Sequence, residues 1–251
     1  MKILLTNDDG FDAVGIRELD RVLSGAGHEV WVCAPSSQRS ACSHAIHLHT
    51  PLEVKKISDR HYSCSGFPAD CVLYAVMGAL PMGRPDVIIS GINNGYNVST
   101  DLVYSGTAGA AAEGSVRGYP AIAVSCADSA FEDAAAFTLR YLEKFTKLCP
   151  PNSYININVP QGSHGRWKVC TLGDVVYRDR LEEHSVEDFY IVTGVEKPYM
   201  EEPYDRMTDY AAVNDNRFIA VSAVRIIPGL HEACQKELEK LSQLDCGISF
   251  C

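Results

Sequence analysis

Short, nearly continuous apolar runs recur along the first 160 residues and predict buried β-strands. They occupy residues 2–6, 29–33, 86–90, 120–125 and 154–159. Strands that are apolar at almost every position are buried on both faces, as in parallel sheets covered by helices. Between them, apolar residues at helical spacing predict helices over 14–25, 69–79, 106–117 and 131–147. This alternation indicates an α/β fold with a doubly wound, mostly parallel, Rossmann-like sheet.

Two segments depart from this alternation. Residues 46–65 contain two short strand-like runs around Ser58-Asp59-Arg60 and predict a hairpin insertion. Beyond residue 160, short runs at 167–171, 189–193 and 217–225 precede an amphipathic stretch at 231–243. We therefore divide the chain into an α/β catalytic core, residues 1–160, and a β-rich C-terminal extension, residues 161–251, that ends in a helix and is not an independent domain.

The net charge of the chain narrows the choice of partners. A charge of −10 disfavours nucleic acid polymers, because binding to them depends on Lys and Arg neutralising phosphates. The apolar runs are far shorter than the roughly 20 residues that a membrane span needs. The first strand leads directly into Asn7-Asp8-Asp9, unlike a signal peptide. We expect a small-molecule substrate, with no nucleic acid polymer and no membrane as partner.

The cysteines indicate a reducing compartment. Ten are scattered along the chain without a Cys-x-x-Cys pair, which favours reduced thiols in a cytoplasmic protein over a disulfide framework. Cys33, Cys126 and Cys170 lie inside apolar runs, where a free cysteine acts as a small apolar residue. We predict a structural role for these three.

Two adjacent carboxylates, Asp8 and Asp9, directly follow the first predicted strand. In an open parallel sheet, ligands bind beyond the carboxyl ends of the strands. Neighbouring carboxylates repel each other unless a proton or a cation relieves them, and a hard divalent metal does so readily. The sequence Asn7-Asp8-Asp9-Gly10 is also ordinary turn chemistry, so this pair alone leaves both interpretations open.

The loops after the next two strands add candidate ligands. In the long loop at 34–44, Ser40 could offer a neutral oxygen to a cation and Arg39 could meet an anion, although an isolated serine there is more often a solvated hydroxyl. The loop at 90–101 contains Asn93, Asn94 and Asn97, whose amide oxygens suit hard cations. Ser105-Gly106-Thr107 then opens an Ala-rich helix, and a helix N-terminus is suited to phosphate. A plain N-cap would explain Ser105 but not the three asparagines.

Other motifs are absent or weak. The chain has neither Gly-x-Gly-x-x-Gly after the first strand nor a phosphate-binding Gly-x4-Gly-Lys-Ser/Thr loop, which weighs against a dinucleotide cofactor and an NTPase. His44, His47 and His49 lack a partner motif for zinc, and strand alternation explains the last two equally well. His44 could still act in acid–base chemistry.

Several motifs in order carry a family resemblance. They are Thr6-Asn7-Asp8-Asp9-Gly10, Arg39-Ser40-Ala41, Gly66-Phe67-Pro68-Ala69-Asp70, Ser90-Gly91-Ile92-Asn93 and Tyr104-Ser105-Gly106-Thr107. The chain closely resembles the SurE family of stationary-phase survival proteins, the 5'/3'-nucleotidases. Asn156-Ile157-Asn158-Val159-Pro160 and Thr208-Asp209-Tyr210-Ala211-Ala212-Val213 extend the resemblance nearly end to end.

The resemblance implies a metal-dependent phosphomonoesterase that hydrolyses nucleoside 5'- or 3'-monophosphates with one divalent cation, Mg²⁺ or Mn²⁺, per subunit. By motif, the metal ligands fall on Asp8, Asp9, Ser40 and Asn93, with Asp8 and Asp9 also catalytic. The phosphate contacts fall on Asn97, Ser105, Gly106 and Thr107. It further implies that the C-terminal extension is exchanged between subunits of a homodimer or homotetramer. A noncatalytic metal-dependent nucleotide binder and a hydrolase of short polyphosphate are the alternatives.

Two positions depart from the family pattern. Ser99 stands where a glycine is usual, and Phe67 replaces a small polar residue near the expected pocket, where it could change the preference for base or sugar. For the reaction we expect a water to attack phosphorus in line, positioned by Asp8 or Asp9. A phosphoaspartate intermediate is the alternative, disfavoured because the chain lacks the Asp-x-Asp pattern of common aspartyl phosphotransferases.

Overall fold

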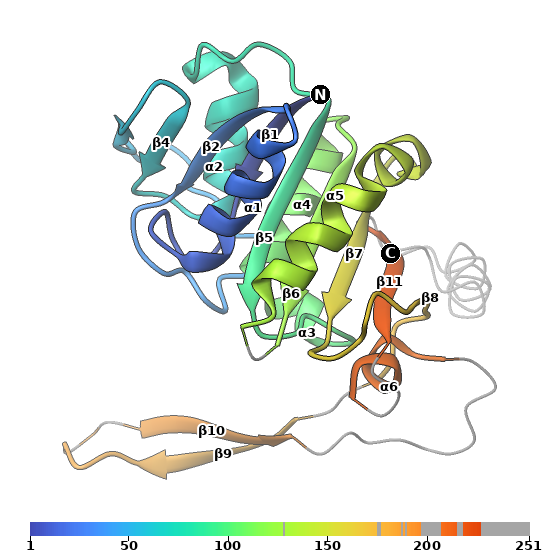
Figure 1. Ribbon diagram of the computed structural model, residues 1–251. Helices are drawn as coiled ribbons and strands as arrows, with labels where there is room; N and C mark the ends of the chain where they lie inside the picture. Colours follow the sequence, from blue (N-terminus) through green and yellow to red (C-terminus); the bar gives the residue numbers. More distant parts are fainter. Residues whose placement is uncertain are drawn as a thin grey trace, which may run out of the picture.

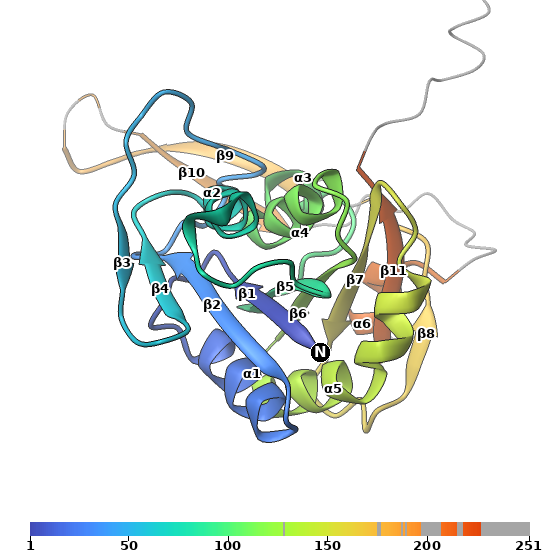
Figure 2. The same cartoon turned by 90° about the horizontal axis from the view of Figure 1, so that it is seen from above.

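The computed structural model describes residues 1–127, 129–174, 177–186, 188, 190–196, 207–214 and 218–226. Its main sheet comprises β1 Lys2–Thr6, β2 Glu29–Pro35, β3 Val54–Lys56, β4 His61–Cys64, β5 Val87–Asn94, β6 Ala121–Cys126, β7 Ser153–Val159, β8 Trp167–Val169 and β11 Ile219–Arg225. The nine strands are ordered β3-β4-β2-β1-β5-β6-β7-β11-β8 (Figures 1 and 2). The predicted strands are β1, β2, β5, β6 and β7, which pair in parallel and confirm the doubly wound sheet.

Helices cover both faces of the sheet (Figure 2). On one face lie α1 Val14–Gly25 and α5 Phe131–Leu148, and on the other lie α2 Pro68–Tyr74 and α4 Gly106–Val116. The alternation of side chains along β1 supplies both cores, because Ile3 and Leu5 pack with α1 and α5 whereas Leu4 packs with α2. A π-helical turn, Ala75–Ala79, extends α2 and completes the predicted helix there.

The direction of winding reverses between β1 and β5. From β1 the chain moves outward through β2 to β4, and it then returns to β5 on the other side of β1 before continuing to β6 and β7. The loops that follow β1 and β5 therefore separate at their carboxyl ends and open a crevice, which is where ligands bind in such sheets. Asp8, Asp9 and Asn93 belong to this edge.

The predicted hairpin at 46–65 extends the main sheet. β3 pairs antiparallel with β4, and β4 pairs parallel with β2 through Val32 and His61. Only 54–56 and 61–64 are strands, so the hairpin is shorter than predicted. It forms one edge of the sheet beside α2.

The main sheet continues beyond residue 160. β11 pairs antiparallel with β7, and β8 pairs parallel with β11. A separate antiparallel pair, β9 Tyr177–Glu183 and β10 Tyr190–Glu196, extends away from the sheet (Figure 1). The short helices α3 Asp101–Tyr104 and α6 Asp209–Asn214, together with β9, are elements that the apolar pattern does not predict. The helix predicted at 231–243 lies outside the described residues.

Two further expectations concern single features of the chain. Cys33, Cys126 and Cys170 are buried free thiols, as their apolar surroundings predict. Within the described residues, no helix has the length and apolar character needed to cross a bilayer.

Candidate active site

A cavity of about 380 Å³ lies at the crevice between the ends of β1 and β5. Its walls include five of the eight residues that the sequence nominates, namely Asp8, Ser40, Asn93, Asn97 and Ser105. Asp9, Gly106 and Thr107 adjoin these residues in sequence without lining the cavity. The cavity thus gathers side chains from the loops after β1, β2 and β5 and from the start of α4.

Asp8 is a buried carboxylate with a dedicated partner. It is 4% exposed, and its Oδ1 accepts a hydrogen bond of 2.5 Å from the hydroxyl of Thr107, which is fully buried. Burial raises the pKa of Asp8, as does the charge of Asp9, although the hydrogen bond from Thr107 acts in the opposite direction. The turn that presents Asp8 is closed by Asn7, whose amide binds the carbonyl of Gly10 at 2.8 Å. A buried carboxylate beside a second one is a favourable place for a cation.

Asp9 and Asn93 are oriented by the end of β5. Asp9 accepts a hydrogen bond from the backbone N–H of Asn94 at 3.3 Å, and burial raises the pKa of this carboxyl too. The Nδ2 of Asn93 donates to the carbonyl of Gly95 at 2.9 Å, which leaves the amide oxygen of Asn93 to offer to a cation. The Asn93 side chain therefore presents an oxygen atom to the cavity, and the Asp9 carboxylate lies beside the end of β5.

Ser40 completes a donor set composed only of oxygen atoms. It is exposed on the loop after β2, where its hydroxyl accepts a hydrogen bond from Gln38 at 2.9 Å. The backbone N–H of Arg39 donates to the carbonyl of Asp8 at 2.7 Å and joins this loop to the end of β1. Two carboxylates, one hydroxyl and one amide oxygen fit a hard divalent cation such as Mg²⁺ or Mn²⁺.

The histidines of the sequence are paired with carboxylates. His44 Nε2 lies 2.7 Å from Glu113 Oε2, and His47 Nδ1 lies 2.7 Å from Asp70 Oδ2. In the described parts of the chain, no group of three or more His, Cys, Asp or Glu side chains could hold a metal ion. His44 lines a different cavity, of about 300 Å³, so its position does not support acid–base chemistry at the candidate site.

Asn97 is fixed by polar side chains from two neighbouring strands. Its Nδ2 donates to the hydroxyl of Ser125 on β6 at 2.9 Å, and its backbone N–H donates to Asn158 on β7 at 2.8 Å. The amides of Asn156 and Asn158 both donate to its carbonyl at 2.9 Å. Ser125, Asn156 and Asn158 support the site and were not nominated from their residue types. The signal of Asn156 and Asn158 is a polar residue at alternate positions of β7, and that of Ser125 is a single polar residue in the apolar strand β6.

Ser105 caps the helix that borders the cavity. Its hydroxyl accepts a hydrogen bond from the backbone N–H of Ala108 at 3.1 Å, as expected for an N-cap. A side chain at Gly106 would come within 2.8 Å of Asp8 Cβ and 2.6 Å of the Cys42 sulfur, so only glycine allows this approach. Thr107 points to Asp8, as described above. The helix start is therefore packed directly against the carboxylate.

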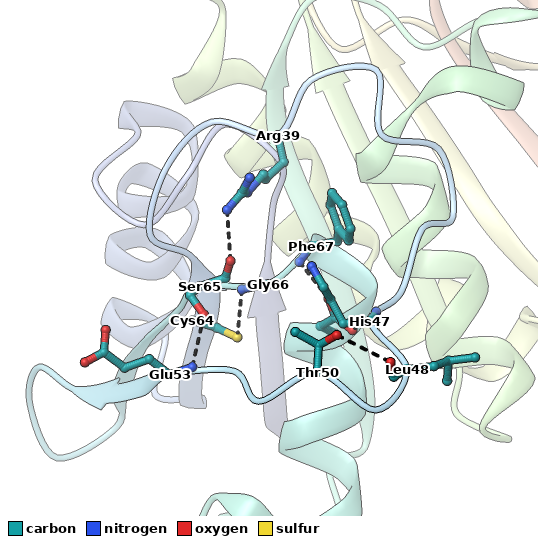
Figure 3. A network of polar contacts seen from close by, with 10 residues as sticks. Arg39, His47, Leu48, Thr50, Glu53, Cys64, Ser65, Gly66 and Phe67 are labelled. Atoms are coloured by element: carbon teal, nitrogen blue, oxygen red, sulfur yellow. Dashed lines mark hydrogen bonds and ion pairs between the residues drawn. The ribbon is translucent and has the colours of Figure 1, made fainter.

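Phe67 stacks on His47 and has Arg39 as a cationic neighbour. The ring of His47 lies 4.6 Å from its centroid, and the guanidinium carbon of Arg39 lies 5.7 Å from it (Figure 3). Arg39 also donates to the carbonyl of Ser65 at 2.9 Å. Phe67 is not among the residues that line the cavity. Its place in the structure is beside the loop that carries Ser40.

Residues from beyond position 160 complete the cavity wall. Tyr210 and Asn214 on α6 line it together with Tyr96, which follows β5. Asp209 is fully buried and accepts backbone hydrogen bonds of 2.9 Å from Ser99 and Gly173, which fixes α6 against the loop after β5. Ser99 adopts a left-handed backbone, φ 55°, at this junction. The sequence pattern does not predict a role at the site for three of these lining residues, Tyr96, Tyr210 and Asn214.

Comparison with known proteins identifies the family of this chain. The sequence profile described as "Survival protein SurE" matches residues 3–179. The chain is 38% identical over 240 residues to "5'-nucleotidase SurE" of Desulforudis audaxviator, covering 90% of this chain and 92% of the relative. It is 43% identical over 227 residues to the protein of the same name from Desulfitobacterium hafniense, covering 86% and 87%.

A solved structure agrees with these relatives in fold. The crystal structure of the SurE protein from Aquifex aeolicus superposes with a TM-score of 0.82 at 30% identity, covering 96% of this chain and all of that one. The relatives and the solved structure thus agree with this chain over nearly its whole length, and the sequence profile agrees over residues 3–179. This chain belongs to the survival protein SurE family.

Proposed function

We propose that this protein is a metal-dependent phosphomonoesterase that releases phosphate from nucleoside 5'- or 3'-monophosphates. The observation that carries the proposal is the cavity at the ends of β1 and β5, where the direction of winding reverses. Asp8, Ser40 and Asn93 meet there beside the start of α4. The relatives compared above are named 5'-nucleotidases, which supports the same activity here.

We assign one divalent cation per subunit, Mg²⁺ or Mn²⁺, to the oxygen atoms of Asp8, Asp9, Ser40 and Asn93. When bound, such a cation would polarise a phosphate oxygen and lower the pKa of a coordinated water. Thr107 and the backbone of Asn94 hold the two carboxylates in place through the hydrogen bonds described above. Pre-oriented ligands reduce the entropy lost when the ion binds.

We assign the phosphate to Asn97 and to the helix start at Ser105, Gly106 and Thr107. The first N–H groups of a helix have no earlier carbonyl to pair with, and their dipoles favour an anion. Because Ser105 caps the N–H of Ala108 and the N–H of Thr107 bonds to Asp8, we assign the phosphate to the remaining N–H, that of Gly106. The absence of a side chain at Gly106 allows close approach to Asp8 and to the loop that carries Ser40. The phosphate and the carboxylates thereby share one small volume.

For the chemical step we favour in-line attack by a water positioned by Asp8 or Asp9. Asp8 borders the cavity, so we place it nearest to the reacting phosphorus. The alternative is a phosphoaspartate intermediate. A single turnover quenched in acid separates them, because a covalent phosphoprotein trapped on Asp8 or Asp9 would replace the water mechanism.

We further propose that Tyr96, Tyr210 and Asn214 receive the nucleoside. Aromatic rings offer stacking faces to a base, and an amide can pair with its polar edge. The cavity volume of about 380 Å³ lies within the range of small-molecule sites. This assignment favours a nucleotide over a bare phosphate ester or a short polyphosphate.

The decisive experiment is phosphate release from a set of substrates with Mn²⁺, with Mg²⁺ and with EDTA. We expect turnover of nucleoside monophosphates with metal, none with EDTA, and slower turnover of glycerol 2-phosphate, which lacks a base. Nucleotide binding without phosphate release would replace the enzyme by a noncatalytic binder. Preferential cleavage of tripolyphosphate would identify a polyphosphatase.

We also propose that the protein acts as a homodimer or homotetramer in the cytoplasm. The β9–β10 pair, which extends from the molecule with apolar residues exposed, supports association between copies of the chain. The buried free thiols of Cys33, Cys126 and Cys170 are compatible with a reducing compartment. Mass measurement in solution and cell fractionation test the two proposals.

A further inference from the structure

His44 is anchored to α4 through a buried carboxylate. Its Nε2 lies 2.7 Å from Glu113 Oε2, while the Nε of Arg117 donates to the other oxygen, also at 2.7 Å. Glu113 is 4% exposed. A buried carboxylate with both oxygens engaged is a stable attachment point, since removal of one donor leaves a buried oxygen without a hydrogen bond. The loop that contains His44 is therefore tied to the helix.

The backbone conformation of this loop, residues 36–44, is unfavourable unless contacts with other elements stabilise it. Ala41 and Ser43 both adopt left-handed conformations, with φ of 55° and 54°, which non-glycine residues rarely do. Contacts with α3 stabilise that conformation. The N–H of Ser43 donates to the carbonyl of Tyr104 at 2.8 Å, and its hydroxyl donates to Val103 at 2.7 Å.

The 36–44 loop also packs on the glycines of α4. A side chain at Gly109 would come within 2.4 Å of the carbonyl of Ser43 and 3.0 Å of the Cα of His44. The helix thus accommodates the loop backbone where the His44 ring reaches Glu113. Ser40, four residues earlier, is exposed and interacts with Gln38 of the same loop. The attachment at residues 43–44 therefore restrains the C-terminal end of the loop that carries Ser40.

We propose that His44, through Glu113, is a positioning residue that holds the 36–44 loop so that Ser40 faces Asp8 and Asn93. The proposal rests on the metal role assigned to Ser40 above. His44 lines the separate cavity beside Tyr154 and Val224 and does not line the candidate site, so its effect passes through the loop backbone. The contact between His44 and Glu113 restricts the position of Ser40, although His44 itself does not bind the ion.

The test measures Mn²⁺ binding directly, by titration followed through the electron paramagnetic resonance signal of free Mn²⁺. His44→Ala should raise the dissociation constant about tenfold, the effect of losing a residue that orients a metal ligand. His44→Gln should restore affinity, because its amide nitrogen can reach Glu113. His44→Asn is too short to do so and should behave like His44→Ala. Thermal unfolding followed by circular dichroism confirms that each variant is folded.

Two further variants separate this proposal from its premise. His61→Ala is the matched control, because His61 pairs with Asp20 at 2.9 Å outside the candidate site and should bind Mn²⁺ as the wild type does. Ser40→Ala should weaken binding. If Ser40→Ala weakens it but His44→Ala does not, only the positioning role of His44 is wrong. If Ser40→Ala has no effect, the assigned ligand role fails, and this proposal fails with it. Equal weakening in His61→Ala would also overturn the proposal.

Discussion

Asp8 illustrates the competition between stability and function at a single residue. Its carboxylate is almost fully buried, next to Asp9, with the hydroxyl of Thr107 as partner. Burying a charge costs free energy unless it is compensated, and one hydrogen bond compensates only part of it. This arrangement does not serve the stability of the fold, and it agrees with the cation that we propose at Asp8.

The variant Asp8→Asn tests this explanation. We expect metal-dependent phosphate release to fall by about 100-fold or more, because a charged ligand is replaced by a neutral one. The free energy of unfolding should stay equal or rise, because burial raises the pKa of Asp8 and so disfavours its charged form. Phosphate-release assays and urea unfolding measure the two effects. Asp12→Asn, at an 84% exposed side chain, is the control, and full activity in Asp8→Asn would remove Asp8 from the ligand set.

Glu113 gives a residue-scale prediction with a defined pH dependence. Burial alone would raise the pKa of Glu113, but hydrogen bonds from His44 and Arg117 outweigh it and lower the pKa below the ordinary 4.5. A carboxyl with a lowered folded pKa stabilises the fold above its unfolded pKa and loses this contribution as pH falls through the folded value. Glu113→Gln should therefore cost about 1–3 kcal/mol at neutral pH, and this difference should shrink below pH 4.5.

Urea unfolding of wild type and Glu113→Gln at several pH values measures this difference. Glu53→Gln, at a side chain that is 64% exposed, should differ from wild type by less than about 0.5 kcal/mol throughout. A Glu113→Gln difference that grows as the pH falls would show that the pair does not stabilise the charged carboxylate.

At the scale of elements, the start of α4 joins the carboxylate to the loop after β2. Gly106 allows this contact, because a Cβ there would lie 2.6 Å from the Cys42 sulfur and 2.8 Å from Asp8 Cβ. Gly106→Ala should destabilise the protein by about 1–3 kcal/mol through overpacking, and it should also reduce phosphatase activity by displacing Asp8. Urea unfolding and phosphate release report the two effects.

Gly25→Ala is the matched control for Gly106→Ala. Gly25 ends α1, and a Cβ there would meet nothing within 4 Å. We expect it to be neutral or to stabilise by about 0.4–1 kcal/mol, since alanine reduces the freedom of the unfolded chain. If both variants have the same midpoint of urea unfolding as the wild type, the close packing at Gly106 does not contribute to the stability of the protein.

The elements also differ in how much of them the sequence predicts. Strands buried on both faces, such as β1 and β5, have a local apolar signature, and Asp8 and Asn93 are recognisable because each lies at a strand end. β9 has the sequence YRDRLEE, whose charges hide its pairing with β10. The place of Tyr210 depends on α6 meeting a loop about 110 residues earlier in the chain. No local pattern encodes that contact.

At the scale of the whole molecule, the β9–β10 pair stands out because it exposes an apolar face to solvent. Leu181 and Val192 are direct neighbours across the two strands, and Tyr190 lies on the same face because side chains alternate. Their exposed fractions are 73%, 65% and 61%. An isolated two-stranded ribbon is only marginally stable in water, and an exposed apolar face favours association. A second copy of the chain would cover this face.

The double variant Leu181→Asp/Val192→Asp tests this role of the ribbon. Charges on the apolar face should oppose burial against another subunit, so we expect the mass measured by light scattering to fall to that of a smaller assembly, with circular dichroism of the core unchanged. Leu148→Asp, at a 71% exposed position on α5, should keep the wild-type mass. A double variant of wild-type mass would exclude the ribbon as the contact that holds the assembly together. A wild-type protein that is monomeric at every concentration would remove the assembly itself, while the cavity at the end of β1 and β5 would keep its assigned chemistry, because its described lining comes from a single chain.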